Sequence, residues 1–372
     1  MMSRAFALSA AAVLAGSILF AFAAGAPQTG KDTPVHLSLP DPAGMEARRH
    51  IFISGHSLTD RPVPYFLSEI ADASGLPIVW NRQHIGGSSI RSRSFGDDAA
   101  RPWSGFSAGT DPEGRPIDVL AELRAPEVPE AGPYDILLIT EQHRLLDTLL
   151  WQDTVTHLGA YQDRFVAANP QGQTFFFTPW LDVSDKSDLA DWIAYERAAW
   201  PVWQCTVARV NDRIAAEGRP DRIFMIPVSL ALADLMAHLR DDPALPGFAF
   251  ADDRQAADAI FSDDVHLTPV GNYFVAALTF HAIYGRLPGP GAPSPIPAGQ
   301  AETLRQFAAA FMDRYRETTP TFDSAACASG PGLPFILHYT GYVERTYTRA
   351  ERGYLRSRIQ QVRDTLRFAF RL

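Results

Sequence analysis

The sequence predicts an α/β fold with a mostly parallel central sheet, on three observations. Short apolar runs recur along the chain, helix-length amphipathic segments separate them, and no internal repeat is present. Apolar runs of this kind are typical of strands buried on both faces of a parallel sheet, and their alternation with helices is the pattern of α/β proteins.

The predicted elements follow in chain order. The first strand is the run HIFIS, which begins at His50. Helical patterns over 64–73 and 195–216 end near Gly75 and Gly218, as expected because glycine commonly terminates a helix. The predicted strands are 50–54, 77–80, 135–140, 174–178 and 223–228.

Two stretches interrupt this alternation. Residues 92–133 are rich in Gly, Pro, Asp and Ser, which predicts either a surface excursion or a substrate-facing insertion beside a site. A run of prolines and glycines over 288–297 precedes helical patterns at 300–317 and 341–369, so we expect a C-terminal helical extension. The expected divisions are a leader over 1–26, a linker over 27–47, a main domain over 48–287 and the extension over 288–372.

The N-terminal segment is interpreted as a targeting signal. After Arg4 comes a long apolar run that ends in Ala24-Gly25-Ala26, the pattern of a cleaved secretory leader. We therefore expect an exported protein, periplasmic or secreted, with no stable membrane span after cleavage. The alternative is an uncleaved membrane anchor, because the run approaches spanning length.

The two cysteines, Cys205 and Cys327, both follow this segment. An exported protein can join them in a disulfide, and two unrelated buried thiols are the alternative. Pairing cannot be deduced from sequence.

Composition excludes few functions. The chain has 372 residues, 46% of them apolar and 20% charged, which is typical of a globular protein. It carries 33 basic and 42 acidic residues, a net charge of −9, and no dense Lys/Arg block, so neither nucleic acid nor an anionic membrane surface is an expected partner. The oligomeric state stays open.

A serine follows the first predicted strand, in the segment GHSLTD. A strand-to-helix turn would display the Ser57 hydroxyl at the carboxyl edge of the sheet, where α/β folds bind ligands. The Ser57 N–H near a helix N-terminus would also be placed to stabilise an oxyanion. Most serines in turns are only turn or cap residues, so the position of Ser57 does not by itself indicate a catalytic nucleophile, and a second feature is required.

The second feature is the segment DDVHLTPVG, which begins at Asp263. Thr268 and Pro269 predict a helix that starts directly after His266. An aspartate three residues before the histidine can fix its tautomer and leave the other ring nitrogen to take a proton from a serine.

Together these two segments resemble the motifs of the SGNH hydrolase superfamily, the GDSL-type esterases and acetylesterases, over roughly residues 48–285. That resemblance implies a three-layer α/β/α sandwich of the flavodoxin-like kind. It also implies Ser57 as nucleophile, His266 as general base and Asp263 as the carboxylate that orients it. Asp264 has the wrong spacing for the motif but could substitute for Asp263 on a flexible loop.

The family's two middle motifs match more loosely. The family uses a glycine N–H after the second strand, and here Gly86 and Gly87 are the candidates, of which position favours Gly86. The family's third motif places an asparagine amide in the oxyanion hole, whereas this chain has Gln142 at the strand end. The expected oxyanion hole is therefore Ser57, Gly86 and Gln142.

His56 stands where the family has aspartate, so the hydrogen bonds around the serine turn must be rebuilt. The expected supporting residues are His56, Glu141 and His143, and either Glu141 or His143 is an alternative to Gln142 in the functional role. Trp103, Trp151 and Trp180 are candidates for stacking on sugar rings, although core packing accounts for most tryptophans.

The resemblance implies an exported serine esterase that removes acetyl or short acyl groups from a carbohydrate or related extracytoplasmic ester. Its partner would be a small-molecule or polysaccharide ester, and no metal or organic cofactor is needed. The altered middle motifs motivate an alternative, a catalytically inactive protein that binds cell-envelope polysaccharide. A third interpretation is a metal-dependent hydrolase built from His56, Asp60, Asp263 and His266.

Overall fold

A parallel sheet of five strands forms the centre of the computed structural model, which describes residues 39–40, 44–45, 49–241, 245–289, 294–318 and 327–372. The strand order is β2-β1-β3-β4-β5, and every neighbouring pair is parallel. This is the strand order of flavodoxin-like doubly wound folds. The strands are β1 (His50–Gly55), β2 (Val79–His84), β3 (Ile136–Thr140), β4 (Gln173–Phe177) and β5 (Ile223–Ile226).

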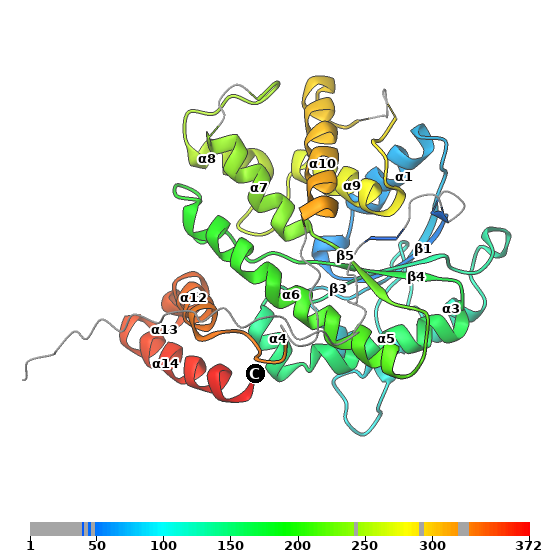
Figure 1. Cartoon of the computed structure of the whole chain (residues 1–372), viewed down its shortest axis with the longest axis horizontal. Helices are drawn as coiled ribbons and strands as arrows, with labels where there is room; N and C mark the ends of the chain where they lie inside the picture. Colours follow the sequence, from blue (N-terminus) through cyan, green and yellow to red (C-terminus); the bar gives the residue numbers. More distant parts are fainter. Residues whose placement is uncertain (1–38, 41–43, 46–48, 242–244, 290–293, 319–326) are drawn as a thin grey trace, which may run out of the picture. The chain divides into compact units, whose positions relative to one another are not determined.

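Helices cover both faces of the sheet, which confirms the expected three-layer α/β/α sandwich (Figure 1). One face carries α1 (Val63–Ala73), α7 (Val228–Asp241) and α9 (Pro269–Tyr284), with α10 (Ala298–Thr318) packed on α9. The other carries α3 (Val119–Arg124), α5 (Thr154–Ala168) and α6 (Ala190–Ala216). The shorter elements are η2 (Ser57–Thr59), α2 (Ile90–Ser94), η3 (Ser104–Ser107), η4 (Pro129–Ala131), α4 (Leu145–Trp151) and α8 (Asp253–Ile260).

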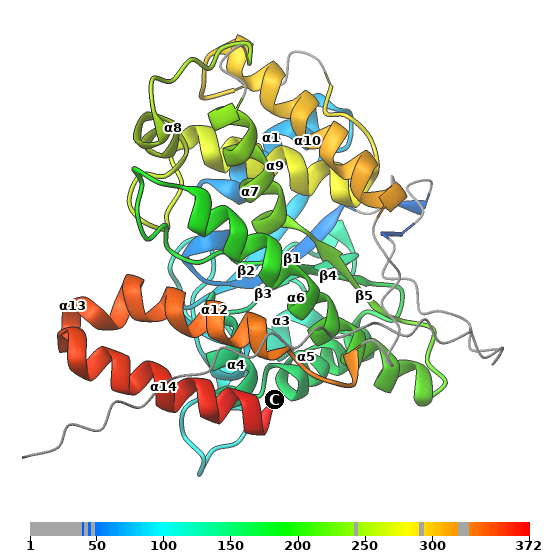
Figure 2. The same cartoon turned by 60° about the vertical axis from the view of Figure 1, so that its left-hand side comes forward.

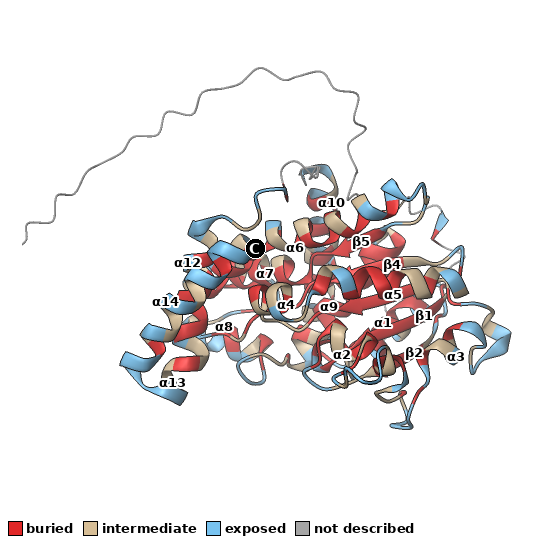
Figure 3. Ribbon diagram, turned by 90° about the horizontal axis from the view of Figure 1, so that it is seen from below, coloured by how far each residue is buried: buried red, intermediate tan, exposed pale blue. Residues whose placement is uncertain are grey.

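The central strands are as apolar as expected, and Figure 3 shows the sheet as the most buried part of the molecule. Every residue of β1, β3 and β5 is buried, because helices lie on both sides of them. The carboxyl ends of these strands point to one edge of the sheet, where the loops after β1, β3 and β4 meet.

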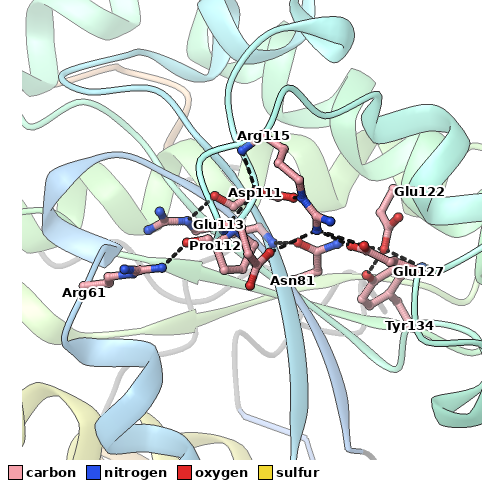
Figure 4. Close-up of polar contacts among 10 residues, drawn as sticks. Arg61, Asn81, Asp111, Pro112, Glu113, Arg115, Glu122, Glu127 and Tyr134 are labelled. Atoms are coloured by element: carbon pink, nitrogen blue, oxygen red, sulfur yellow. Dashed lines mark hydrogen bonds and ion pairs between the residues drawn. The ribbon is translucent and has the colours of Figure 1, made fainter.

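The prediction for β2 is wrong in position. The strand runs over Val79–His84 rather than 77–80, so Asn81 and Gln83 belong to it. The insertion over 92–133 supplies their partners, since Asn81 Nδ2 donates to Glu122 Oε1 at 2.9 Å (Figure 4) and Gln83 Nε2 donates to backbone carbonyls, Gly105 O among them at 2.8 Å. Long-range hydrogen bonds thus allow a polar sequence to form an edge strand.

The C-terminal extension begins with α10, which confirms the helix expected over 300–317, and then forms a helical hairpin. Its elements are α12 (Leu333–Val343), the π-helix η5 (Glu344–Thr348), α13 (Arg349–Arg352) and α14 (Tyr354–Arg371). The helix expected over 341–369 is therefore interrupted, because Gly353 adopts φ +74° and reverses the chain. Helices α12 and α14 lie side by side (Figure 2).

The extension is attached to α6. Cys205 of α6 and Cys327 form a disulfide, which decides between the two alternatives left open by the sequence. The ring of Tyr195, also on α6, packs against Tyr339 and Tyr342 of α12, with centroids 6.2 and 5.0 Å apart. The described residues constitute one compact unit.

The expected leader over 1–26 lies outside the described residues. Within the described part, the helices are all too short or too polar to cross a bilayer.

Candidate active site

Ser57 is exposed at the carboxyl end of β1, as the first residue of η2. Its neighbours Gly55, His56 and Leu58 are all buried, so the turn brings the hydroxyl out of a well-packed segment. The Gly55 position admits no larger residue, because an added Cβ would lie 1.9 Å from Thr59 Oγ1. Close packing of the turn therefore places Ser57 at the sheet edge, as the sequence indicated.

The side chain of His56 stabilises this turn through a hydrogen bond to the loop after β3. Its Nε2 lies 2.8 Å from the backbone oxygen of Glu141, and a carbonyl can only accept, so Nε2 carries the proton. Burial, reinforced by the charge of Arg93, lowers the pKa of His56 to about 3. His56 is thus a neutral structural group that joins the β1 and β3 loops.

Asp263 and His266 form the expected pair. Asp263 Oδ2 lies 2.7 Å from His266 Nδ1, and Asp263 Oδ1 accepts the backbone N–H groups of Val265 and His266 at 2.8 and 2.6 Å. Partial burial raises the pKa of Asp263, but these hydrogen bonds outweigh it and hold the pKa below its usual value. An ionised Asp263 keeps the proton on Nδ1 and leaves Nε2 of His266 as a proton acceptor.

The loop that carries His266 is held at both ends. On one side Thr268 caps α9, its hydroxyl accepting from the Gly271 N–H, and Pro269 is the first helical residue, as predicted. On the other side the buried Trp180 donates from Nε1 to the backbone oxygen of Val265 at 2.8 Å. Trp180 therefore positions the loop and is not available for stacking on a sugar.

His143 links the two loops. Its Nε2 lies 3.7 Å from Asp182 Oδ1 in the loop after β4, and burial, with a smaller contribution from the charge of Arg144, lowers the pKa of His143 to about 4. The charge of His143 in turn contributes to the lowered pKa of His56, the residue before Ser57. Val183, the residue after Asp182, donates its backbone N–H to the oxygen of Asp264 at 2.7 Å, and His56 is hydrogen-bonded to Glu141 O. Hydrogen bonds thus join the His266 loop to the loop after β4, and the Ser57 turn to the loop after β3.

Two residues at this edge were missed from the sequence. Asp182 lies 3.7 Å from His143 Nε2, and burial raises its pKa, with the charges of Asp264 and Asp263 adding to the effect. Its backbone N–H donates to the hydroxyl of Tyr347, whose ring stacks on His143 with centroids 6.3 Å apart. Asp182 follows the fourth strand and could have been found from that position, whereas nothing in the sequence pointed to Tyr347 of η5.

The candidate oxyanion residues stand on the β2 and β3 loops. Gly86 and Gly87 are both exposed in one turn, and Gly87 has φ +62°. Gln142 Oε1 accepts from the backbone N–H of Arg144 at 3.0 Å. The Nε2 group of the same amide can therefore donate to a different acceptor.

Glu141 connects these two loops and is completely buried. Its carboxylate accepts from the backbone N–H groups of Ile90 and Gln142 and from the Thr154 hydroxyl, at 2.9, 2.7 and 2.8 Å. Burial raises the pKa of Glu141, partly offset by the charge of Arg93. The Glu141 carboxylate therefore joins the loop after β2 to the loop after β3 through hydrogen bonds to protein groups.

A groove of about 350 Å³ begins beside these loops. Gly87 and Gln142 line one part of it and the half-exposed ring of Trp151 another, whereas Ser57, His266 and Gly86 are not among its lining residues. The remaining lining residues are Ser88, Ser89, Ser92, Asp97, Arg144, Asp147, Thr148 and Gln152. Ser92 and Asp97 lie in or beside the 92–133 insertion, which therefore faces the groove in part.

The four residues considered from the sequence as metal ligands do not form a cluster; they are His56, Asp60, Asp263 and His266. His56 is bonded to Glu141, and Asp60 pairs with Arg82 on β2 and with His84, whose Nε2 is 3.5 Å away. Over the ranges that the structure describes, no three His, Cys, Asp or Glu side chains are grouped to bind a metal ion.

The comparisons with known proteins find similarity in structure only. Neither the family models nor the curated proteins contain a match. A crystal structure of a DUF4886 family protein from Bacteroides uniformis is 15% identical, with a TM-score of 0.48, covering 73% of this chain and 97% of that one. A second crystal structure is also 15% identical, with a TM-score of 0.33, covering 65% of this chain and 96% of the other.

Proposed function

We propose that this protein is an exported serine esterase of the SGNH type. The observation that carries the proposal is the pairing of Asp263 Oδ2 with His266 Nδ1 at 2.7 Å, on a loop at the sheet edge where Ser57 is exposed. A carboxylate, an imidazole and a hydroxyl in this order are the parts of nucleophilic acyl transfer.

In this mechanism His266 Nε2 takes the proton of Ser57 as its Oγ attacks the ester carbonyl. Asp263 stabilises the imidazolium that forms, and the tetrahedral oxyanion accepts hydrogen bonds from the Ser57 N–H, the Gln142 amide and a glycine N–H of the β2 loop. His266 then returns the proton to the leaving alcohol. Water, activated by the same imidazole, hydrolyses the acyl-enzyme and releases the acid.

Two features support the assignment of these donors. Gln142 has its oxygen held by Arg144 N–H, which favours presentation of its N–H₂ group to an oxyanion. Gly86 is favoured by its position in the motif, while Gly87 is the glycine that shares the groove with Gln142. We keep Gly86 as the proposed donor and take Gly87 as the competing one.

The groove supports a polar, polyhydroxylated substrate. Its lining offers hydroxyls, amides and carboxylates, and Trp151 adds an exposed aromatic face of the kind on which sugar rings stack. An acetyl or short acyl ester of a carbohydrate fits this lining. Its alcohol part would occupy the groove, with the acyl carbon at Ser57.

Export is supported by the disulfide between Cys205 and Cys327, because such bonds persist mainly outside reducing compartments. It is also supported by the leader pattern over residues 1–26. A periplasmic or secreted location follows from both.

The decisive experiment compares Ser57→Ala with Ser107→Ala, a control at an exposed serine of η3. Turnover of acetylated sugars and short acyl esters should fall at least about 10³-fold in Ser57→Ala and stay unchanged in the control. A fluorophosphonate probe should label the wild-type protein at Ser57. Retained turnover in Ser57→Ala contradicts the proposal, and a wild-type protein that binds polysaccharide but neither labels nor turns over supports the inactive binding protein instead.

A further inference from the structure

Helix α14 is amphipathic, but its apolar face is exposed, whereas an ordinary surface helix buries its apolar face. Five of its large apolar side chains point outward and are between 52% and 84% exposed. On a helix of 3.6 residues per turn they fall within a sector of about 80°, so they form one continuous stripe. We call this the α14 stripe, and it consists of Leu355, Ile359, Val362, Leu366 and Phe370.

The opposite face of α14 packs on the protein through mostly polar contacts. Ser357 donates to Glu344 at 2.5 Å, and the hydroxyls of Thr365 and Thr340 lie 2.8 Å apart. Phe368 is the large apolar residue of the helix that is buried, against the ring of Tyr339. Because these contacts fix the rotation of α14, the stripe cannot turn inward without breaking them.

Arginines flank the stripe. Residues 349–372 contain seven arginines and only two acidic residues, in a chain whose net charge is −9. These arginines are spaced along α13 and α14 and form no dense block, so the expectation from composition that an anionic membrane surface is not a partner did not take this helix face into account. Arg363 and Arg367 share the single carboxylate of Asp364, at 3.7 and 3.5 Å, so positive charge remains beside the stripe. Figure 3 shows α13 and α14 as exposed ribbon at one end of the described molecule.

We propose that the α14 stripe docks this protein on the surface of an anionic lipid bilayer. A helix with an apolar stripe and flanking cations is suited to lie in a membrane interface, with the stripe among acyl chains and the arginines at headgroup phosphates. The straight, convex face of a helix matches a flat surface, and a helix of this polarity lies on a bilayer and does not span it.

Charge favours lipid over a second copy of the chain. In a symmetric dimer the same patch meets itself, so the arginines beside one stripe would face those beside the other. An anionic surface instead neutralises them. The inference does not depend on esterase activity, since none of the proposed catalytic residues lies on α14.

The test is co-sedimentation of the purified protein with vesicles. We expect at least a tenfold larger bound fraction on vesicles of equal phosphatidylglycerol and phosphatidylcholine than on phosphatidylcholine alone, and a decrease from 50 to 500 mM salt as charges are screened. Ile359→Gln/Val362→Gln should lose this binding without unfolding, because both side chains are more than half exposed. The matched control, Val128→Gln/Leu287→Gln, also replaces two exposed apolar residues and should bind as the wild type does.

Any contribution of the N-terminal apolar segment is the same in all of these proteins, so the comparison between variants isolates the stripe. Equal binding by the stripe variant and the control overturns the proposal, as does failure of the wild type to bind anionic vesicles. A dimer in light scattering that the stripe variant converts to monomer, without vesicle binding, also overturns it and assigns the stripe to a second copy.

Discussion

The two loops that carry the proposed nucleophile and base are built in different ways. The Ser57 turn rests on buried groups: His56 is hydrogen-bonded to Glu141 O, and the Glu141 carboxylate accepts hydrogen bonds from Ile90, Gln142 and Thr154. The His266 loop is more exposed, and a single carboxylate, that of Asp263, makes three hydrogen bonds within it. The nucleophile is therefore positioned by the core, whereas the base depends on local contacts that one substitution can remove.

Among the residues that support the nucleophile and the base, the largest effect should come from Asp263→Asn. The amide oxygen can still accept the backbone N–H groups, but its N–H₂ would face His266 Nδ1 and force the proton onto Nε2, the wrong tautomer for a base. We expect at least a 100-fold loss of kcat on an acetyl ester. This loss is smaller than the roughly 10⁴-fold loss known for a buried carboxylate, because water can partly replace the hydrogen bonds of an exposed carboxylate. Asp263 is 58% exposed.

Asp264→Asn is the matched control for this experiment. It makes the same chemical change one residue away, and in this segment the hydrogen bond to Val183 N–H uses the Asp264 backbone oxygen, which the substitution keeps. Near wild-type kcat is expected. A larger loss of kcat in Asp264→Asn than in Asp263→Asn would contradict this prediction and show that Asp264 is the carboxylate that orients His266.

The second prediction concerns acid stability of the Ser57 turn. His56 has a folded-state pKa of about 3, below its ordinary value of 6.5, so between these values the unfolded chain binds a proton that the folded one does not. Its contribution to stability is present above pH 6.5 and is lost progressively as pH falls toward 3. From pH 7 to pH 5 this loss amounts to about 2 kcal/mol.

Urea unfolding at pH 7 and pH 5 measures that loss, and His56→Gln should reduce the difference between the two pH values by about 2 kcal/mol. The readout is a difference within each protein, so the constant cost of the substitution cancels. His143→Gln offers a second test, because burial also lowers the pKa of His143, to about 4. Unchanged pH dependence in both variants would contradict the neutral, buried state of these rings.

The smallest effect should come from Trp180→Phe. This change keeps a buried ring but removes the hydrogen bond from Nε1 to Val265 O, so the His266 loop becomes less well positioned. We expect kcat to fall about tenfold with little change in KM, the cost of one lost neutral hydrogen bond near 1.4 kcal/mol.

Trp203→Phe is its control, since Trp203 is equally buried but packs on Phe176 in the core of the other face. Both variants should lose stability by a similar amount on account of the smaller ring. If kcat falls equally in both, the loss reflects general loosening of the core and not the loop contact.

Much of the α/β framework could be predicted from the sequence because it is encoded locally. The apolar runs at β1, β3, β4 and β5 identify strands wherever they pack, and Thr268-Pro269 marks the start of α9 by its own chemistry. The pairing of Asp263 with His266 was also local, since only three residues separate them. A polar strand such as β2 could not be placed in this way, because its backbone pairs with β1 and its polar side chains are hydrogen-bonded to the insertion that follows it.

The sequence by itself determined the fold class, the exposed Ser57 turn and the Asp263–His266 pair, because each depends on residues close together in the chain. Only the tertiary structure decided that His143, Asp182 and Tyr347 meet at the edge of the sheet, since these come from three separate segments. It also decided which face of α14 is buried. A helical pattern specifies an apolar face, but the polar contacts of Ser357 and Thr365 with the rest of the hairpin turn that face outward.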